Sequence, residues 1–184
     1  MTEGLGQKIR AERDRRGWSL TDLAERSAVS RAMINRIERG ESSPTATVLG
    51  RLSGAFGLTM SELLAAPAQA ATRLSRAGDP ARLWQDPETG YLRERIAAPA
   101  GEGRGLDIVR VTLPPGARVD FPPEAYSFLM QSVWVLSGRL LFEEGETRWQ
   151  LGPDDCLTLG APQRCAFVNP GQEACVYAVV IARV

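Results

Sequence analysis

Histidine is absent from this 184-residue chain. Histidine is the side chain that proteins use most for acid–base catalysis near pH 7 and for binding transition metals, so its absence weighs against both activities. Cysteine is scarce: Cys156, Cys165 and Cys175 are odd in number and include no CxxC pair. This pattern argues against a disulfide framework and a structural zinc site, and it predicts three buried or half-buried free thiols.

Long hydrophobic runs are missing as well. The first ten residues, MTEGLGQKIR, lack the apolar core of a signal peptide. No later run reaches the roughly 18 apolar residues that cross a membrane. We therefore expect a cytoplasmic protein without membrane contact.

The chain has no net charge, but its charges are unevenly distributed. Residues 1–66 hold 10 basic and 8 acidic side chains, a balance of +2. Residues 67–184 hold 12 basic and 14 acidic side chains, a balance of −2. The basic N-terminal part suits a polyanionic partner, and the acidic remainder argues against a second nucleic-acid surface.

The stretch from Ser19 to Gly40, SLTDLAERSAVSRAMINRIERG, predicts two short helices joined by a tight turn. Ser19 is suited to cap the first helix and Ser30 the second, and Gly40 suits the left-handed end of the second helix. On the second helix, Ile34 and Ile37 share one face, which predicts that this face is buried.

The opposite face of the second helix carries arginines and an amide but no acid. Arginine suits bidentate hydrogen bonding to guanine, asparagine suits adenine, and a small alanine allows close approach to a thymine methyl group. A helix capped by serine with its first turn aimed outward can enter the major groove of double-stranded DNA. We predict that the base-contacting residues are Arg31, Ala32, Asn35 and Arg36.

The same stretch resembles the DNA-binding domains of the λ-repressor/Cro-like (XRE) family. The resemblance rests on Leu23-Ala24, Val29-Ser30, Ile34, Ile37-Glu38 and Gly40. It implies that the loop after Gly40 and the start of the next helix hold DNA phosphates, which position the protein without specifying sequence. The expected phosphate contacts are Ser30, Arg39, Ser42, Ser43 and Thr45. The alternative is a helical hairpin that packs against a partner protein.

Further helices are predicted at residues 5–16, 45–56 and 61–64, where apolar residues recur every three or four positions. Arg13 lies one turn after Ile9 and should lean toward the body of the domain, where we predict an ion pair with Glu38; the family resemblance implies the same pair. Five helices complete a domain at 1–66, and an Ala-rich linker follows at 67–80.

From residue 81 onward the pattern changes to short strands. A hairpin is predicted between Trp84 and Tyr91, a Pro/Gly-rich loop at 97–105, and several strands from Leu106 to the C-terminus. The phrases LPPGARVDFPP, WVLSGRLLF and AFVNPG resemble the cupin family, a jelly-roll β-barrel. The predicted fold class is therefore α + β in two domains, with a five-helix λ-repressor-like helix-turn-helix domain followed by an all-β cupin barrel at 81–184.

The cupin resemblance implies a divalent metal held by histidines and a glutamate, and every one of these ligands is replaced here. Aligning Gly138 and Asn169 with the family's motifs places the ligand positions at Glu124/Ala125, Tyr126/Ser127, Gln131 and Cys165. These residues offer too few donors for a catalytic metal, and no nucleophile–base pair can be assembled without histidine. We expect no metal, no cofactor, no catalytic residue and no enzymatic activity.

The former ligand positions should instead line a small-molecule pocket inside the barrel. Strand alternation turns neighbouring residues two positions away toward the same side. The predicted pocket consists of Glu124, Tyr126, Gln131, Val133, Val135, Cys165 and Phe167. A filled core without a cavity is the alternative. Trp134 and Leu136 lie on the other strand face and should pack against another sheet or a second subunit.

These features together predict a one-component transcriptional regulator that binds operator DNA through its helices. Its barrel would bind a small-molecule effector and form a homodimer, because helix-turn-helix domains of this size usually bind DNA as dimers. The alternatives are a cupin enzyme fused to a DNA-binding domain, a protein-interaction module, and a redox sensor in which Cys165 pairs with Cys156 or Cys175.

Overall fold

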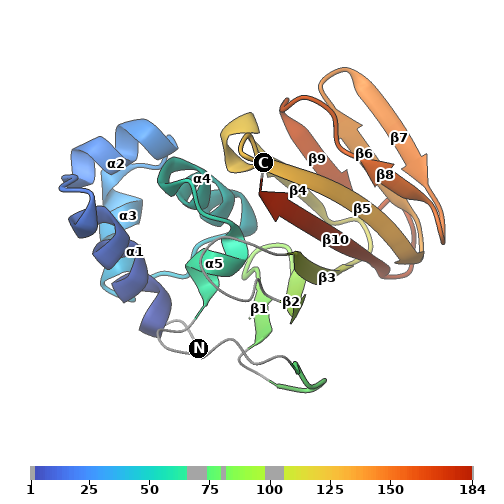
Figure 1. Ribbon diagram of the computed structural model, residues 1–184, viewed down its shortest axis with the longest axis horizontal. Coiled ribbons are helices and arrows are strands. Elements are labelled where there is room, and N and C mark those ends of the chain that lie inside the picture. Colours follow the sequence, from blue (N-terminus) through green and yellow to red (C-terminus); the bar gives the residue numbers. More distant parts are fainter. Residues whose placement is uncertain (1–2, 66–73, 80–81, 98–105, 184) are drawn as a thin grey trace.

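The computed structural model describes residues 3–65, 74–79, 82–97 and 106–183. A helical part formed by residues 3–65 lies beside a β-rich part formed by the later described residues (Figure 1). Most of the predicted linker at 67–80 and of the predicted loop at 97–105 falls outside the described residues. Within the described part, no helix is long and apolar enough to cross a membrane.

Five helices make up the N-terminal part. Their bounds are α1 Glu3–Arg15, α2 Leu20–Ser27, α3 Arg31–Glu38, α4 Ala46–Phe56 and α5 Met60–Leu64. Four of them begin at a hydroxyl cap, in which the side chain of Ser19, Ser30, Thr45 or Thr59 accepts a hydrogen bond from a backbone amide of the first turn. These caps satisfy amides that have no partner inside the helix, which explains why the helices begin where they do.

The helical core is assembled from the apolar stripe of each helix. Ile9, Leu23, Ile34, Leu49 and Leu52 are completely buried in it. An ion pair closes the core on one side, as predicted.

In this pair, Arg13 Nε lies 2.7 Å from Glu38 Oε1, and its Nη2 lies 2.8 Å from Oε2. The bidentate geometry ties α1 to α3 and confirms the predicted ion pair.

The described residues of the C-terminal part form ten strands and the short 3-10 helix η2. The strands are β1 Leu83–Gln85, β2 Leu92–Ala97, β3 Asp107–Leu113, β4 Arg118–Phe121, β5 Leu129–Ser137, β6 Leu140–Glu144, β7 Thr147–Leu151, β8 Cys156–Thr158, β9 Cys165–Val168 and β10 Cys175–Arg183. The 3-10 helix η2, Pro123–Ala125, precedes β5. All strand pairs are antiparallel, and β1 and β2 form the expected hairpin.

The strands are arranged in two sheets. One has six strands in the order β1-β2-β3-β10-β5-β8, and the other has four in the order β4-β9-β6-β7. In the centre of the larger sheet, β10 pairs with both β3 and β5. Val109, Val111, Phe142 and Tyr177 fill the space between the sheets with completely or almost completely buried side chains. Each sheet therefore supplies one wall of a common core.

The helical part is packed directly on the β-rich part. Helix α4 lies against η2 and β4 through two glycines. A Cβ atom at Gly54 would come within 2.5 Å of Glu124 O, and one at Gly50 within 2.6 Å of Phe121 Cδ1. Side chains at these positions would thus prevent the observed approach.

Polar contacts add to this interdomain interface. The amide of Ala46 donates to Asp86 Oδ2 at 2.6 Å, and Arg93 Nη2 donates to Ser61 Oγ at 2.9 Å. Near the C-terminus, Arg183 Nη2 lies 2.6 Å from Glu62 Oε2. Helices α4 and α5 are therefore held at separate points by the β1–β2 turn, by β2 and by β10.

Candidate DNA interface and barrel cavity

Helix α3 has one buried face and one exposed face. Ile34 and Ile37 point into the helical core, with exposed fractions of 0% and 2%. The predicted base-contacting residues are all exposed on the other side: Arg31, Ala32, Asn35 and Arg36. Ser30 caps this helix by accepting from Met33 N at 3.2 Å, so the N-terminal turn is fixed and open to solvent.

The predicted phosphate-contacting residues surround α3. Ser30, Arg39 and Ser43 are exposed, and Ser42 and Thr45 are half-buried. Arg39 forms an exposed ion pair with Glu41 at 2.7 Å, which a phosphate could replace at small cost. Thr45 Oγ1 accepts from Val48 N at 3.3 Å.

The next amide of α4, that of Ala46, is already bonded to Asp86 and is buried, so it is not available to a phosphate.

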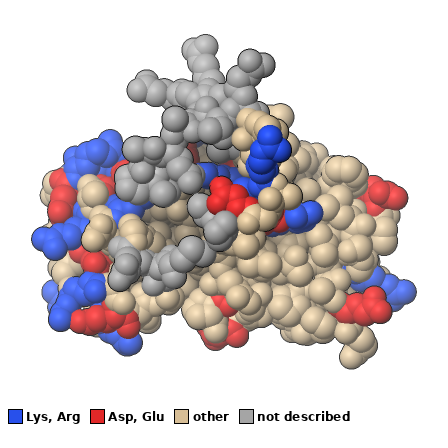
Figure 2. Space-filling view, turned by 90° about the horizontal axis from the view of Figure 1, so that it is seen from below, with Lys and Arg blue, Asp and Glu red and all other residues tan. Residues whose placement is uncertain are grey.

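Charged side chains are unevenly distributed over the surface. Figure 2 shows arginines and acids gathered over the helical half of one face, whereas most of the barrel half of that face is uncharged. Several large apolar side chains are exposed on the barrel: Met130, Trp134, Leu136 and Trp149. The first three alternate along β5 and therefore share the outer face of the larger sheet.

A cavity of about 50 Å³ opens between the barrel and the helical domain. Four of the predicted pocket residues line it: Tyr126, Gln131, Cys165 and Phe167. Val133 and Val135 lie further along β5, completely buried in the filled core. Glu124 is exposed on η2, where its backbone contacts α4.

Sequence reasoning did not identify the residues that complete the cavity. Tyr91 and Arg93 come from the start of the barrel, and Thr59 and Met60 come from the helical domain. The alternation on β2 makes Arg93 a buried position, but only the packing of α5 over the open end of the barrel brings the two domains to one cavity.

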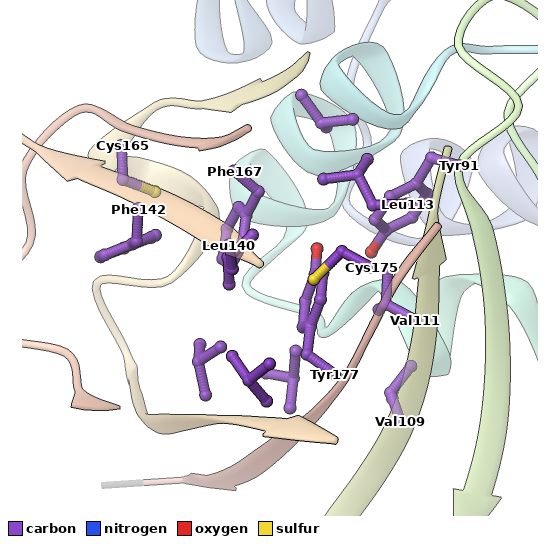
Figure 3. Close-up of a cluster of buried hydrophobic side chains, with 14 of the residues drawn as sticks. Tyr91, Val109, Val111, Leu113, Leu140, Phe142, Cys165, Phe167, Cys175 and Tyr177 are labelled. Atoms are coloured by element: carbon purple, nitrogen blue, oxygen red, sulfur yellow. The ribbon is translucent and has the colours of Figure 1, made fainter. Parts of the chain in front are cut away.

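Aromatic rings form the floor beneath this cavity. Phe167 stacks on Tyr177 with ring centroids 5.5 Å apart and contacts Phe142 at 4.8 Å. Figure 3 shows these rings between the two sheets, with Tyr91 approaching from the side of β2. Stacked, close-packed rings make this wall rigid and apolar.

The predicted ligand positions of a metal site do not form a donor set. Among the described residues, no three cysteine, aspartate, glutamate or histidine side chains converge on one point. The Tyr126 hydroxyl donates to Gln163 O and accepts from Gln163 N, the latter at 2.9 Å. This phenol therefore ties the end of η2 to the loop before β9.

The three thiols are free. Cys165 and Cys175 are buried as predicted, but Cys156 is exposed, so the prediction of three buried or half-buried thiols is wrong for Cys156. Burial raises the pKa of Cys165 to about 12, although a hydrogen bond with Tyr126 acts in the opposite direction. Burial also raises the pKa of Cys175 to about 11. Because the thiolate is the reactive form, these two thiols are poor nucleophiles at neutral pH, which argues against a redox role for Cys165.

Comparison with known proteins separates the two parts of the chain. Residues 9–63 match the helix-turn-helix family HTH_3. The HTH-type transcriptional regulator SutR of Escherichia coli (strain K12) is 39% identical over 66 residues, which are 36% of this chain and 37% of SutR. The match therefore spans only about a third of that relative.

Solved structures show likeness over a greater length. An HTH_3 family transcriptional regulator from Vibrio cholerae has a TM-score of 0.80 and 23% identity, covering 100% of this chain and 97% of that chain. The Cupin_2 domain of an XRE family transcriptional regulator from Enterobacter cloacae has a TM-score of 0.46 and 20% identity, covering 51% of this chain and 97% of that domain. The full-length likeness confirms the predicted fold class.

Proposed function

We propose that this chain is a DNA-binding transcriptional regulator and not an enzyme, because residues 9–63 match the HTH_3 helix-turn-helix family. The observation that carries the proposal is the outer face of α3. Its arginines and amide are exposed and face away from the core, on a helix held in place by two buried isoleucines. A rigid helix with this face can enter a major groove.

Within this proposal, Arg31, Ala32, Asn35 and Arg36 contact base edges, and Ser30, Arg39, Ser42, Ser43 and Thr45 contact phosphates. The experiment is selection of bound sequences from random double-stranded DNA, followed by affinity measurements by fluorescence anisotropy. Arg36→Ala should cost roughly 1–3 kcal/mol on the selected site and relax the preference at one position.

Ser42→Ala should instead weaken all sequences about equally. Arg148→Ala, which removes an exposed barrel arginine, is the matched control and should leave DNA affinity unchanged. An Arg36→Ala chain with the specificity and affinity of the parent would exclude this mode of binding.

The barrel, in this proposal, joins two copies into a homodimer. The support is the exposed apolar row of Met130, Trp134 and Leu136 on β5, since single soluble domains rarely leave such rows uncovered. Trp134→Glu should convert the dimer to a monomer in analytical ultracentrifugation and reduce operator affinity. Trp149→Glu, on the other sheet, is the control; a monomeric parent protein would contradict the proposal.

The cavity between the barrel and α5 is the proposed effector site, and a cytoplasmic effector would reach it directly. Its support is its position, since Thr59 and Met60 of the helical domain form part of its wall. A ligand there would alter the contact between the domains without acting through the linker. DNA affinity that is the same with and without every ligand bound by the cavity would contradict the sensing role.

A further inference from the structure

Arg93 is a buried cation in the wall of the cavity. Its side chain lines the cavity although the residue is only 6% exposed. Nη2 donates to Ser61 Oγ at 2.9 Å, and the guanidinium also interacts with the Tyr91 hydroxyl, so at most two of its five N–H donors are engaged. The guanidinium therefore has donors left over for another group.

The carboxylates around Arg93 either pair with other arginines or form no direct contact with its guanidinium. Glu94 pairs with Arg82 and Arg110, and Glu62 pairs with Arg183. Asp107 is 2% exposed and acts on Arg93 through its charge, with Ser61 as its polar neighbour, but neither of its oxygens accepts a hydrogen bond from Arg93. Among the described residues, Arg93 thus forms no direct ion pair, and the charge of Asp107 compensates it only from a distance, which is costly for a buried cation.

The remainder of the wall is mainly apolar and aromatic. Phe121, Leu129, Phe167 and Ile181 contribute carbon surface, and Gln131 contributes an amide. A water molecule needs roughly 10–15 Å³ of such space, so a cavity of about 50 Å³ holds only a few waters or a ligand of a few heavy atoms. One cation in a small apolar wall matches a small anion with a hydrocarbon tail.

We propose that the cavity binds a short-chain carboxylate, with its carboxylate group on Arg93 and its hydrocarbon tail against the aromatic floor. Bound in this way, the ligand contacts Thr59 and Met60 at the start of α5 and barrel residues at the same time. The proposal rests on the proposed sensing function, because it names the chemical class of the effector for that site.

The first test uses the full chain and pairs of ligands with equal shape. Binding of acetate, propionate and butyrate is measured by isothermal titration calorimetry and compared with acetamide, propionamide and butyramide. Saturable binding of a carboxylate at least roughly tenfold tighter than its amide is expected, because a charge-assisted pair is replaced by a neutral one. Equal affinity for acid and amide, or no saturable binding of any carboxylate, overturns the proposal.

The second test changes the charges around the site. Arg93→Gln should weaken carboxylate binding by roughly tenfold to a hundredfold, and Arg110→Gln, an exposed arginine on the neighbouring strand, should have no effect. Asp107→Asn should tighten binding roughly threefold to tenfold, because it removes a negative charge near the bound anion.

If Arg93 were only structural, Asp107→Asn would not raise the affinity for the carboxylate. Unchanged or weaker binding in that variant overturns the proposal, even if Arg93→Gln fails to fold.

A measurement of DNA affinity separates this inference from the sensing function. If butyrate binds as expected but DNA affinity does not respond, the ligand class stands and the sensing role fails. If an uncharged molecule occupies the cavity and changes DNA affinity while carboxylates do not bind, the sensing role stands and the ligand class is wrong.

Discussion

The backbone amide of Ala46 and the carboxylate of Asp86 join the two domains through a hydrogen bond of 2.6 Å. Asp86 is buried in the turn between β1 and β2, and its other oxygen accepts from Glu88 N at 2.7 Å and Thr89 N at 3.2 Å. One carboxylate thus organises its own turn and also satisfies the first amide of α4. A negative charge at this position also suits the positive end of the helix dipole.

Replacing Asp86 by asparagine should destabilise the protein by about 1–2 kcal/mol, because charge-assisted hydrogen bonds become neutral and one amide nitrogen cannot accept. Urea unfolding followed by circular dichroism measures the change. Asp154→Asn, on an exposed loop with a left-handed backbone that asparagine tolerates, is the control and should be nearly neutral. Equal stability of the two variants would show that the contact contributes nothing.

Gly54→Ala tests the close approach of α4 and η2. The added Cβ would lie 2.5 Å from Glu124 O and 2.9 Å from Ala125 Cα, so backbone must move. We expect a loss of roughly 1–3 kcal/mol, as for overpacked cores. The control is Gly4→Ala on α1, where the new Cβ meets nothing within 4 Å and helix propensity favours alanine.

Calorimetric melting would show the effect as a lower midpoint or as two separate transitions for Gly54→Ala. A midpoint at or above that of the parent chain would mean that the two domains do not depend on this contact.

Asp107 should make stability depend on pH. Burial raises the pKa of this carboxyl, and the charge of Arg93 only partly opposes the shift. An acid whose pKa is higher in the folded state binds its proton more tightly when folded. Its contribution therefore favours the folded state less as the pH rises from the ordinary aspartate value through the raised one.

Asp107→Asn should consequently stabilise the chain at pH 7, by about 1.4 kcal/mol for each unit of the pKa shift. The gain should shrink as the pH is lowered toward the ordinary aspartate pKa of about 4, which urea titrations between pH 4 and pH 8 would reveal. A gain that is constant with pH would instead indicate improved packing alone.

Thiol reactivity tests the remaining redox alternative. Because burial raises the pKa values of Cys165 and Cys175, a disulfide reagent at pH 8 should modify only the exposed Cys156 rapidly in the native chain. All three thiols should react in denaturant, and Cys156→Ser should abolish the rapid phase. A second rapid thiol in the Cys156→Ser chain would show that a buried cysteine is activated.

Features with local causes were predictable from the sequence. The caps at Ser19, Ser30 and Thr45 and the buried stripe of α3 depend on residues within one or two turns, so their pattern predicts their structure. The cupin resemblance predicted that Gln131 faces inward, and this residue lines the cavity. Strand alternation then turned Val135 inward as well, but it could not show that the cavity ends before that residue, where the core is filled.

The rest of the site depends on contacts between residues far apart in the chain. Arg93 meets Ser61 across 32 positions, and Asp86 meets Ala46 across 40. Neither contact can be predicted from the separation of its residues in the sequence, because it depends on how α4 and α5 pack on the barrel. The two glycines of α4 were the available signal, since glycine in a helix interior is unfavourable unless something approaches closely.

The close contact of α4 with η2 and β4 at Gly50 and Gly54 has a consequence for operator recognition. Because the helical domain packs directly on its barrel, it cannot rotate freely about the linker. Each protomer would therefore move as one rigid body. In a dimer formed through the barrels, two such rigid protomers would hold their α3 helices at a fixed distance and angle. Inserting a few base pairs between the half-sites would then rotate one major groove away from its α3 helix. The protein would therefore discriminate operators by the spacing of their half-sites as well as by their base sequence.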